Sequence, residues 1–266
     1  MRTLFVAASI AVSLFLSSTS FGMGAEDVVK KSQATFLYPG KDFKARVMMK
    51  LINKDGQERI RELTMLRKNY SESGGEQKYF MYFHQPADVR DMTFLVWKYP
   101  RKDSDRWLFI PAIKLVKRIA ANDKRSSFVG SDFSYEDVSG RAVDEDNHSL
   151  LREEKYEGRD VQVVKSAPKA PESVDFGYKL SWIDKESFIP WKEEYYDKRG
   201  SLSKVFTANE VKSIEGYITV VKRTMRNVQS GHRTEVIFND VKYNQGLSDS
   251  LFTERSLKNL PREIAR

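Results

Sequence analysis

The 266-residue chain contains no cysteine and only three histidines, and these scarcities exclude several kinds of chemistry. Without cysteine the chain has no disulfide, no thiolate metal ligand, no thiol nucleophile and no cysteine that could carry a lipid anchor. His84, His148 and His232 stand far apart in the sequence, and none belongs to an H-E-x-x-H pattern. We therefore predict no metal site and no cofactor, and we expect structural or surface roles for the imidazoles.

Common catalytic signatures are missing as well. The sequence has no G-x-S-x-G turn, no phosphate-binding glycine loop and no G-x-G-x-x-G fingerprint. Carboxylates are adjacent at Glu153-Glu154 and Glu193-Glu194, but neighbouring residues on a strand point to opposite faces, so neither pair forms an acid–base dyad by itself. The sequence therefore predicts a protein that is not an enzyme. A hydrolase whose site is assembled from distant residues is the alternative.

Long apolar runs are confined to the N-terminus. Arg2 precedes an uncharged run from Leu4 to Leu16, and small residues follow as far as Ala25. This order is typical of a secretory signal peptide, and the run is short for a membrane span, which needs roughly 20 residues. We predict a signal peptide at 1–25, cleaved near residues 22–25, and a single domain at 26–266. An uncleaved anchor is the alternative.

The short n-region with its arginine is bacterial in character, so we predict a periplasmic location. Removal of the signal peptide takes away Arg2 and no acid, which lowers the net charge from +8 to +7. With 40% hydrophobic and 31% charged residues, the chain is neither disordered nor a polytopic membrane protein.

Basic residues cluster between Lys114 and Arg125, which invites a nucleic-acid interpretation. Acidic residues are interspersed almost everywhere, and export removes most nucleic acid from reach, so we predict no nucleic-acid partner. A solvated face is the simplest role for the cluster. The second role is transient contact with anionic lipid head groups or with an acidic partner.

The rest of the chain is patterned mostly as strands. A first helix is predicted at 26–35 and a last short helix at 251–260. The polar segment 121–149 is predicted as a long loop with helical turns near 131–138. The predicted strands are 44–52, 59–67, 77–84, 93–99, 106–110, 115–120, 160–167, 178–184, 189–196, 201–207, 216–227 and 233–243.

Several predicted strands are apolar on both faces, notably 79–83, 94–97 and 107–110. A half-exposed antiparallel strand would alternate apolar and polar residues instead. A single antiparallel sheet whose middle is covered on both sides would produce this pattern. So would a sheet curled around helices or around an apolar cavity. On the residue pattern alone, an ordinary filled core is a slightly better explanation than a cavity.

The middle of the chain carries the most distinctive motifs. These are W-L-F-I-P-A at 107–112, V-K-R-I at 116–119 and S-F-V-G-S-D-F-S-Y-E-D at 127–137. Together they resemble the LolA-related outer membrane lipoprotein-sorting family, in its larger branch of exported proteins from diverse bacteria. Segments 83–90, 194–200 and 251–253 fit the same pattern in the expected order, so the resemblance covers essentially the whole mature chain.

The resemblance implies a mainly β fold with a few helices. The sheet would be antiparallel and strongly curved, an unclosed half-barrel with helices on its concave side. It also implies a periplasmic carrier that holds lipid or lipoprotein acyl chains in an apolar cavity for sorting to the outer membrane. An inner-membrane exporter and an outer-membrane acceptor would be its partners. The alternative is a non-enzymatic envelope sensor or exporter accessory on the same fold.

Two sets of site residues follow from these expectations, and segment 121–149 is expected to act as the lid. Strand alternation nominates as cavity lining Tyr79, Met81, Phe83, Phe94, Val96, Trp107, Phe109, Leu180, Trp182 and Trp191. Charge-assisted hydrogen bonds between a basic pair and the acidic motif are expected to fix the loop, through Lys117, Arg118, Asp132, Tyr135, Glu136 and Asp137.

Overall fold

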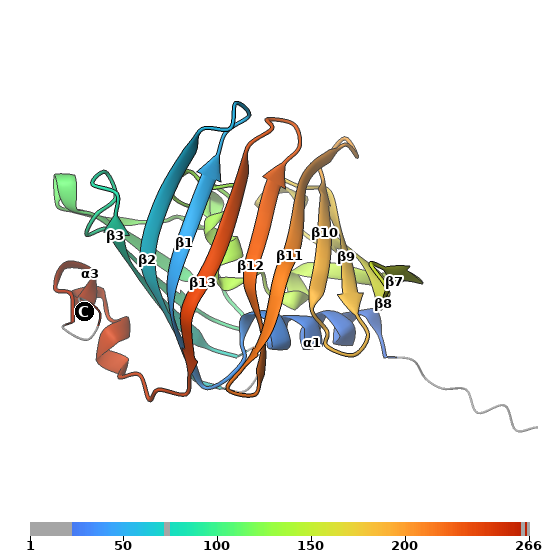
Figure 1. The fold of residues 1–266 in the computed structure, drawn as a ribbon, viewed down its shortest axis with the longest axis horizontal. Coiled ribbons are helices and arrows are strands. Elements are labelled where there is room, and N and C mark those ends of the chain that lie inside the picture. The colour runs from blue at the N-terminus through green and yellow to red at the C-terminus, as the bar shows by residue number, and fades with distance from the viewer. Residues whose placement is uncertain (1–22, 72–74, 262–263, 265–266) are drawn as a thin grey trace, which may run out of the picture.

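A computed structural model describes residues 23–71, 75–261 and 264 of the chain. Most of the predicted signal peptide, residues 1–22, lies outside the described residues. Within them, thirteen strands form one antiparallel sheet that does not close into a barrel (Figure 1). The predicted mainly β, half-barrel class is therefore confirmed.

The sheet consists of two meanders that meet in its middle. The strands of the first are β1 (Asp42–Ile52), β2 (Glu58–Asn69), β3 (Gln77–Gln85), β4 (Thr93–Lys98), β5 (Asp105–Ile110) and β6 (Leu115–Arg118). Those of the second are β7 (Asp146–Tyr156), β8 (Arg159–Pro168), β9 (Tyr178–Asp184), β10 (Pro190–Tyr196), β11 (Leu202–Ile214), β12 (Tyr217–Asn227) and β13 (Arg233–Tyr243). Strand β13 pairs with β1, so β6 and β7 are the two edges.

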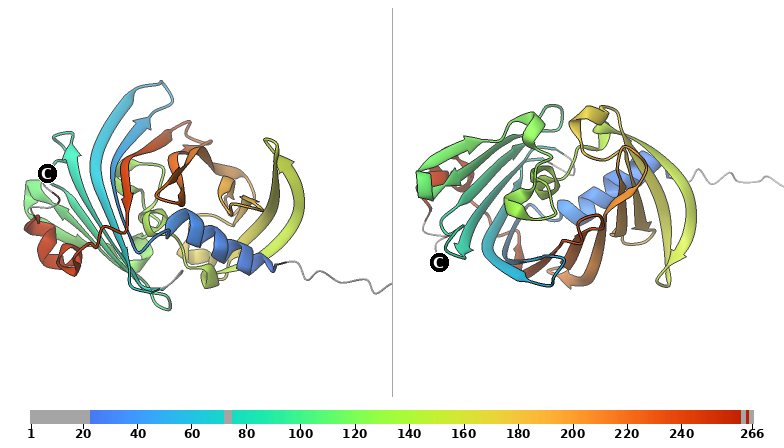
Figure 2. Two further views of the ribbon diagram at one scale, coloured as in Figure 1. Left: turned by 60° about the horizontal axis from the view of Figure 1, so that its bottom comes forward. Right: turned by 90° about the horizontal axis from the view of Figure 1, so that it is seen from above.

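Helices cover both faces of the curved sheet (Figure 2). The α-helices are α1 (Ala25–Leu37), α2 (Tyr135–Ser139) and α3 (Glu254–Lys258). Short 3-10 helices are η1 (Pro111–Ile113), η2 (Ala121–Asp123), η3 (Phe128–Gly130), η4 (Val143–Glu145), η5 (Pro171–Ser173) and η6 (Asp249–Phe252). Helix α1 and the connection between β6 and β7, residues 119–145, lie on the concave side. We call these residues the covering segment.

The two covered faces explain the strands that are apolar on both sides. On β3, Tyr79 and Met81 contribute to a concave cluster that also includes Phe94 and the covering segment's Phe128. The intervening Phe80 belongs to a convex cluster formed with η6 and α3. Full burial of an aromatic or large aliphatic side chain contributes about 1.5–3 kcal/mol, so each layer of cover contributes to stability.

Three elements differ most from the prediction, while the bounds of the other predicted strands and of the first helix shift by at most two residues. Strand β7 was not predicted, because it is an edge strand whose side chains are mostly exposed and carry no apolar alternation. Strand β11 runs to Ile214, beyond the predicted end at 207. The predicted helix at 251–260 is divided into η6 and α3, since Thr253 between them is extended. No helix within the described residues is both long enough and apolar enough to cross a membrane.

Candidate ligand site under the concave face

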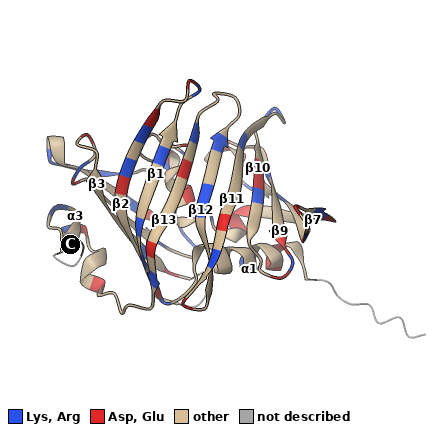
Figure 3. Ribbon diagram, viewed as in Figure 1, with Lys and Arg blue, Asp and Glu red and all other residues tan. Residues whose placement is uncertain are grey.

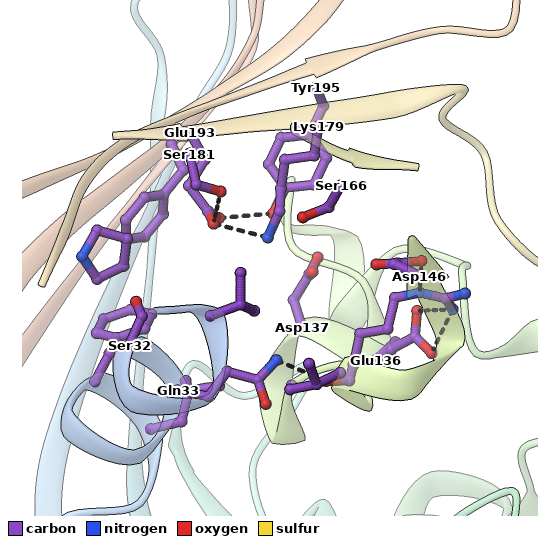
Figure 4. A pocket seen from close by; sticks show the side chains of 18 of the residues that line it. Ser32, Gln33, Glu136, Asp137, Asp146, Ser166, Lys179, Ser181, Glu193 and Tyr195 are labelled. Atoms are coloured by element: carbon purple, nitrogen blue, oxygen red, sulfur yellow. Dashed lines mark hydrogen bonds and ion pairs between the residues drawn. The ribbon is translucent and has the colours of Figure 1, made fainter. Parts of the chain in front are cut away.

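Three small pockets adjoin one another between the concave face, α1 and the covering segment. The first, of about 110 Å³, lies between α1, the covering segment and strands β7–β12 (Figure 4). Two smaller pockets, of about 40 and 50 Å³, lie against the middle of the sheet. Phe36, Phe133 and Val138 each line two of the three pockets, and Arg223 lines all three. The pockets are therefore neighbours in one layer.

One wall of the first pocket is a polar group on β9 and β10. Lys179 Nζ donates to Glu193 Oε1 at 2.7 Å, and Ser181 Oγ donates to the same oxygen at 2.9 Å. The Tyr195 hydroxyl donates to Glu193 Oε2 at 3.0 Å (Figure 4). Burial opposes the charge on Lys179, but the neighbouring Glu193 raises the pKa of Lys179 above its usual value. This group is an ion pair with its hydrogen bonds satisfied inside the molecule.

The opposite wall is an ion cluster within and beside the covering segment. Glu136 accepts from Lys124 Nζ at 2.9 Å and lies 3.4 Å from Arg141 Nη1. Arg141 Nε also donates to Asp146 Oδ1 at 2.9 Å, and Glu145 lies 3.5 Å from Lys124 Nζ. Buried ion pairs add little net stability because desolvation offsets the attraction, but the loss of one partner is costly. The cluster therefore holds this part of the segment in one arrangement.

The smallest pocket is lined mostly by apolar side chains, whereas the wall of the other smaller pocket also contains Arg67, Thr219 and Arg223. Met65 lines both of them. The smallest is bounded by Val47, Met49, Leu63, Met65, Met81, Phe128, Phe133, Asp137, Val138, Arg223, Val236 and Phe238. Ligand pockets usually have volumes of about 300–1,000 Å³, so an acyl chain enters this layer only if α1 or the covering segment moves.

Polar contacts attach the covering segment to the central strands. Asp132 Oδ2 accepts from Thr234 Oγ1 at 2.7 Å and lies 2.6 Å from His232 Nδ1. Lys204 Nζ donates to the carbonyl oxygen of Asp132 at 2.9 Å, and Arg61 donates to the carbonyl oxygen of Val129. These contacts join the segment to β2, β11 and β13.

Helix α2 is stabilised at both of its ends. At its start, Ser134 Oγ accepts from the Asp137 backbone N–H at 3.1 Å, and Asp137 Oδ2 accepts from the Ser134 N–H at 2.7 Å, a capping box. At its end, Lys98 Nζ donates to the Ser139 and Gly140 carbonyl oxygens at 2.9 and 3.0 Å. A cation at a helix C-terminus also interacts favourably with the helix dipole.

Arg223 on β12 lies where the three pockets meet. Its guanidinium carbon is 5.4 Å from the ring centre of Phe36, 5.6 Å from Phe133 and 4.8 Å from Phe238. Its Nε is buried without a hydrogen bond partner. Burial lowers the pKa of Arg223 to about 10, while Asp137 acts in the opposite direction. Cation–π contacts of this kind contribute about 0.5–2 kcal/mol each, and they are its main compensation for desolvation.

The residues predicted to line the cavity do not all share one face of the sheet. Those in the concave cluster are Tyr79, Met81, Phe83, Phe94 and Val96, and Trp191 packs against it. Trp107 and Phe109 lie instead under η6 and α3 on the convex face. Leu180 and Trp182 belong to a separate cluster with Val161 and Val163, because their neighbours Lys179 and Ser181 point into the first pocket. Alternation separates two faces without indicating which one is concave.

The structure also corrects the partners predicted for the acidic motif. Lys117 is exposed, and Arg118 pairs with Asp105. The partners of Asp132, Glu136 and Asp137 are those described above. Tyr135 contributes no ion pair and packs between aromatic rings, with its ring centre 5.4 Å from that of Phe94 and 5.6 Å from that of Phe128.

Sequence reasoning missed Lys179, Glu193 and Arg223. Lys179 alternates with Leu180, and the cavity lining was predicted from the large apolar residues alone. The available indication for Arg223 was its position two residues before the buried Met225, since residues i and i+2 share a face of a strand. Among the described side chains, no group of three or more His, Asp or Glu residues is arranged to hold a metal ion.

Comparison with solved structures finds close likenesses over most of the chain. A domain from Vibrio parahaemolyticus, described as an outer membrane lipoprotein-sorting protein, is 30% identical, with a TM-score of 0.81 over 88% of this chain and 98% of that one. A DUF1329 family protein from Desulfovibrio piger is 28% identical, with a TM-score of 0.80 over 88% and 97% of the two chains.

A third structure shows the fold at lower identity. It is a LolA superfamily protein from Nitrosomonas europaea, 22% identical, with a TM-score of 0.67 over 88% of this chain and 99% of that one. A family model described as that of an uncharacterized protein matches residues 75–259. A search of curated proteins finds no match.

Proposed function

The chain belongs to the LolA-like family of outer membrane lipoprotein-sorting proteins, and on this premise we propose that it is a periplasmic carrier of lipid or lipoprotein acyl chains. In this proposal the protein performs no catalysis. It accepts an acyl chain from an inner-membrane exporter and releases it to an outer-membrane acceptor.

The observation that carries the proposal is the apolar layer between the concave face and its two covers. Three adjoining pockets occupy that layer, and Met65 lines the two smaller ones. Each buried methylene contributes about 0.8 kcal/mol, so shielding about ten of them would contribute roughly 8 kcal/mol. That is enough to keep a chain out of water during transit while still permitting its release.

Loading requires the covers to move, because the pockets are much smaller than an acyl chain. The covering segment contains no long helix or strand. It is attached by the buried rings of Phe128 and Tyr135, by the ion cluster around Glu136 and by polar contacts such as that between Asp132 and Thr234. A bound acyl chain would replace the apolar contacts of the rings, and the polar contacts with the sheet can be exchanged for contacts with water. We therefore assign the role of lid to the covering segment, which lies almost entirely within the predicted loop at 121–149.

Export is part of the proposal. Residues 1–22 have the order of a signal peptide, and Met23 and Ala25 pack against the cluster of Val28, Val164 and Ile183. A mature chain that begins at Met23 would keep these contacts.

The test is to express the full chain in a bacterium, release the periplasm by osmotic shock and purify the protein without detergent. Intact mass spectrometry would give the mature N-terminus, and lipid mass spectrometry of an organic extract would identify co-purified acyl chains. Uptake of a fluorescent fatty acid by the delipidated protein gives a second measure. We expect stoichiometric lipid or saturable uptake.

A pair of variants makes the test specific. Met65→Trp fills the two smaller pockets and should reduce uptake several-fold. Met48→Trp makes the same change on β1, where Met48 alternates with the buried Val47 and Met49, and should leave uptake unchanged. Absence of both co-purified lipid and uptake in the unaltered protein would contradict the carrier proposal and favour a sensor or exporter-accessory role.

A further inference from the structure

Arg223 differs from the other cations of the site in having no acceptor for its hydrogen bonds. Lys179 is paired with Glu193, and Arg141 is paired with Glu136 and Asp146. Within residues 23–71, 75–261 and 264, no hydrogen bond or ion pair reaches the Arg223 guanidinium. Its neighbours are the faces of Phe36, Phe133 and Phe238, which come from α1, the covering segment and β13.

The acids around the first pocket have other partners, which for Asp137 holds for Oδ2 alone. Glu193 receives three donors, and Glu136 and Asp146 face Arg141. Asp137, the acid that most affects Arg223, accepts the backbone N–H and the hydroxyl of Ser134 in the cap of α2. These bonds orient the Asp137 carboxylate toward the start of its own helix.

We propose that Arg223 binds the anionic head, a carboxylate or a phosphate, of an amphiphile whose acyl chain occupies the apolar layer of the concave side. A guanidinium presents a planar fork of donors that matches the two oxygens of such a head. The aromatic rings around the guanidinium lower the local dielectric constant, which strengthens the interaction. The head would replace the missing acceptors, and the chain would extend along the pockets that contain Met65 and Phe238.

This inference rests on the proposed carrier function and narrows its cargo. The acyl chains of a lipoprotein are attached through ester and amide bonds, and such a junction carries no charge. A free fatty acid or an anionic phosphate ester carries its negative charge at the end of the chain. The site therefore favours an anionic amphiphile over the acyl chains of a lipoprotein.

The test compares four ligands of one chain length that differ only in their heads. Dodecanoate, dodecyl phosphate, dodecanol and dodecyltrimethylammonium are titrated below their micelle concentrations into the delipidated protein, with displacement of a neutral fluorescent probe as the readout. We expect the two anions to bind at least about tenfold more tightly than the alcohol, and the cation to bind most weakly. Acetate at the same concentration should not displace the probe, because it lacks the chain.

Substitutions then test whether the preference for anionic ligands depends on Arg223. Arg223→Met should remove the advantage of the anions while leaving dodecanol binding unchanged, and Arg223→Lys should keep part of it. Arg226→Met is the matched control, since Arg226 is exposed on the same strand and should leave the preference intact. The carboxylate of ¹³C-labelled dodecanoate provides an independent readout, because contact with Arg223 should keep it ionised to lower pH.

The outcomes separate the two proposals. If all four ligands bind equally to the unaltered protein, or if Arg223→Met keeps the preference for anions, the role of Arg223 is overturned and the carrier function stands. If none of the four displaces the probe, the carrier function fails and this inference fails with it. If Arg223→Met does not fold, the ligand series on the unaltered protein and on the Arg223→Lys variant still tests whether Arg223 binds the anionic head.

Discussion

Lys98 on β4 is a buried cation that joins the sheet to the end of α2. Its side chain is 5% exposed, and its ammonium donates to the carbonyl oxygens of Ser139 and Gly140 and to the Tyr38 hydroxyl. Burial lowers the pKa of Lys98 to about 7, with Arg106 acting in the same direction. An unfolded lysine titrates near 10.4, so the two states bind different numbers of protons between these values.

This difference predicts how stability depends on pH. Between about pH 7 and 10 the unfolded chain holds the Lys98 proton and the folded chain releases it, so the free energy of unfolding rises with pH by about 1 kcal/mol per unit. The penalty of the buried charge is fully present below the folded pKa and is relieved as pH rises. In urea unfolding between about pH 7.5 and 9.5, the slope for the unaltered protein should exceed the slope for Lys98→Met by about this amount.

Lys102→Met is the control, because Lys102 is exposed in the turn after the same strand and should leave the slope unchanged. Parallel slopes for the unaltered protein and Lys98→Met would show that Lys98 keeps its ordinary proton affinity. The tyrosines with raised pKa values are present in all of these proteins, so their contribution cancels when the slopes are compared.

At the level of single residues, the sequence predicted correctly the properties that depend on one strand alone, such as the face on which a side chain lies. Adjacent glutamates were predicted to point to opposite faces, and this is confirmed, since Glu193 lines the first pocket while Glu194 pairs with Lys192. The role of Arg223 could not be predicted in this way. It depends on Phe36 and Phe133, which are distant in sequence and meet Arg223 only in the folded chain.

Among the elements, the covering segment is the one on which the proposed function depends. Asp132 is 7% exposed, and its carboxylate contacts Thr234 and His232 on and beside β13. Asp132→Ala removes both contacts and should lower stability by about 1–3 kcal/mol. Hydrogen exchange should show faster exchange at residues 128–139 than in the unaltered protein, while β1 and β13 remain protected.

Asp123→Ala is the matched control, since Asp123 is an exposed acid in the same segment. If the covering segment is the lid, Asp132→Ala should also accelerate uptake of a fluorescent fatty acid. Movement of the segment would be contradicted if residues 128–139 exchanged as slowly as the central strands in both the unaltered protein and Asp132→Ala.

Strands that alternate clearly were predicted well. The bounds of β9 and β13 match the predicted ranges 178–184 and 233–243. Strand β7 was missed because an edge strand is held by backbone hydrogen bonds to one neighbour, which leave no mark in the side-chain pattern. The predicted helical turns near 131–138 correspond in place to α2.

On the scale of the whole molecule, charged residues of both signs are distributed over the strands, whereas exposed aliphatic side chains occur at a few positions. Figure 3 shows basic and acidic residues interspersed along the strands. At the β6 edge, however, Ile113 and Leu115 are 64% and 47% exposed and stand beside Lys114 and Lys117. Exposed aliphatic residues next to lysines suit brief contact with an anionic membrane surface.

The double variant Ile113→Asn/Leu115→Asn should therefore weaken binding to vesicles that contain phosphatidylglycerol, by about tenfold for the loss of two partly inserted side chains. Co-sedimentation at low salt measures this, and binding should fall as salt rises. Leu150→Asn/Leu151→Asn makes the same change at the opposite edge, on β7, where the exposures are 42% and 47%. Equal binding of both double variants and the unaltered protein would contradict contact through the β6 edge.

The sequence by itself determined the absence of cysteine chemistry, the mainly antiparallel sheet, the positions of most strands and the motifs of the family. The absence of cysteine and the strand positions follow from composition and from a period of two residues, which are local properties of the chain. The antiparallel sheet follows from the resemblance that the motifs carry. The tertiary structure alone decided which face is concave, which residues the covering segment contacts and where Arg223 lies. Period-two alternation defines two faces of a strand equally well, and only contacts between distant segments determine which face curves around a ligand site.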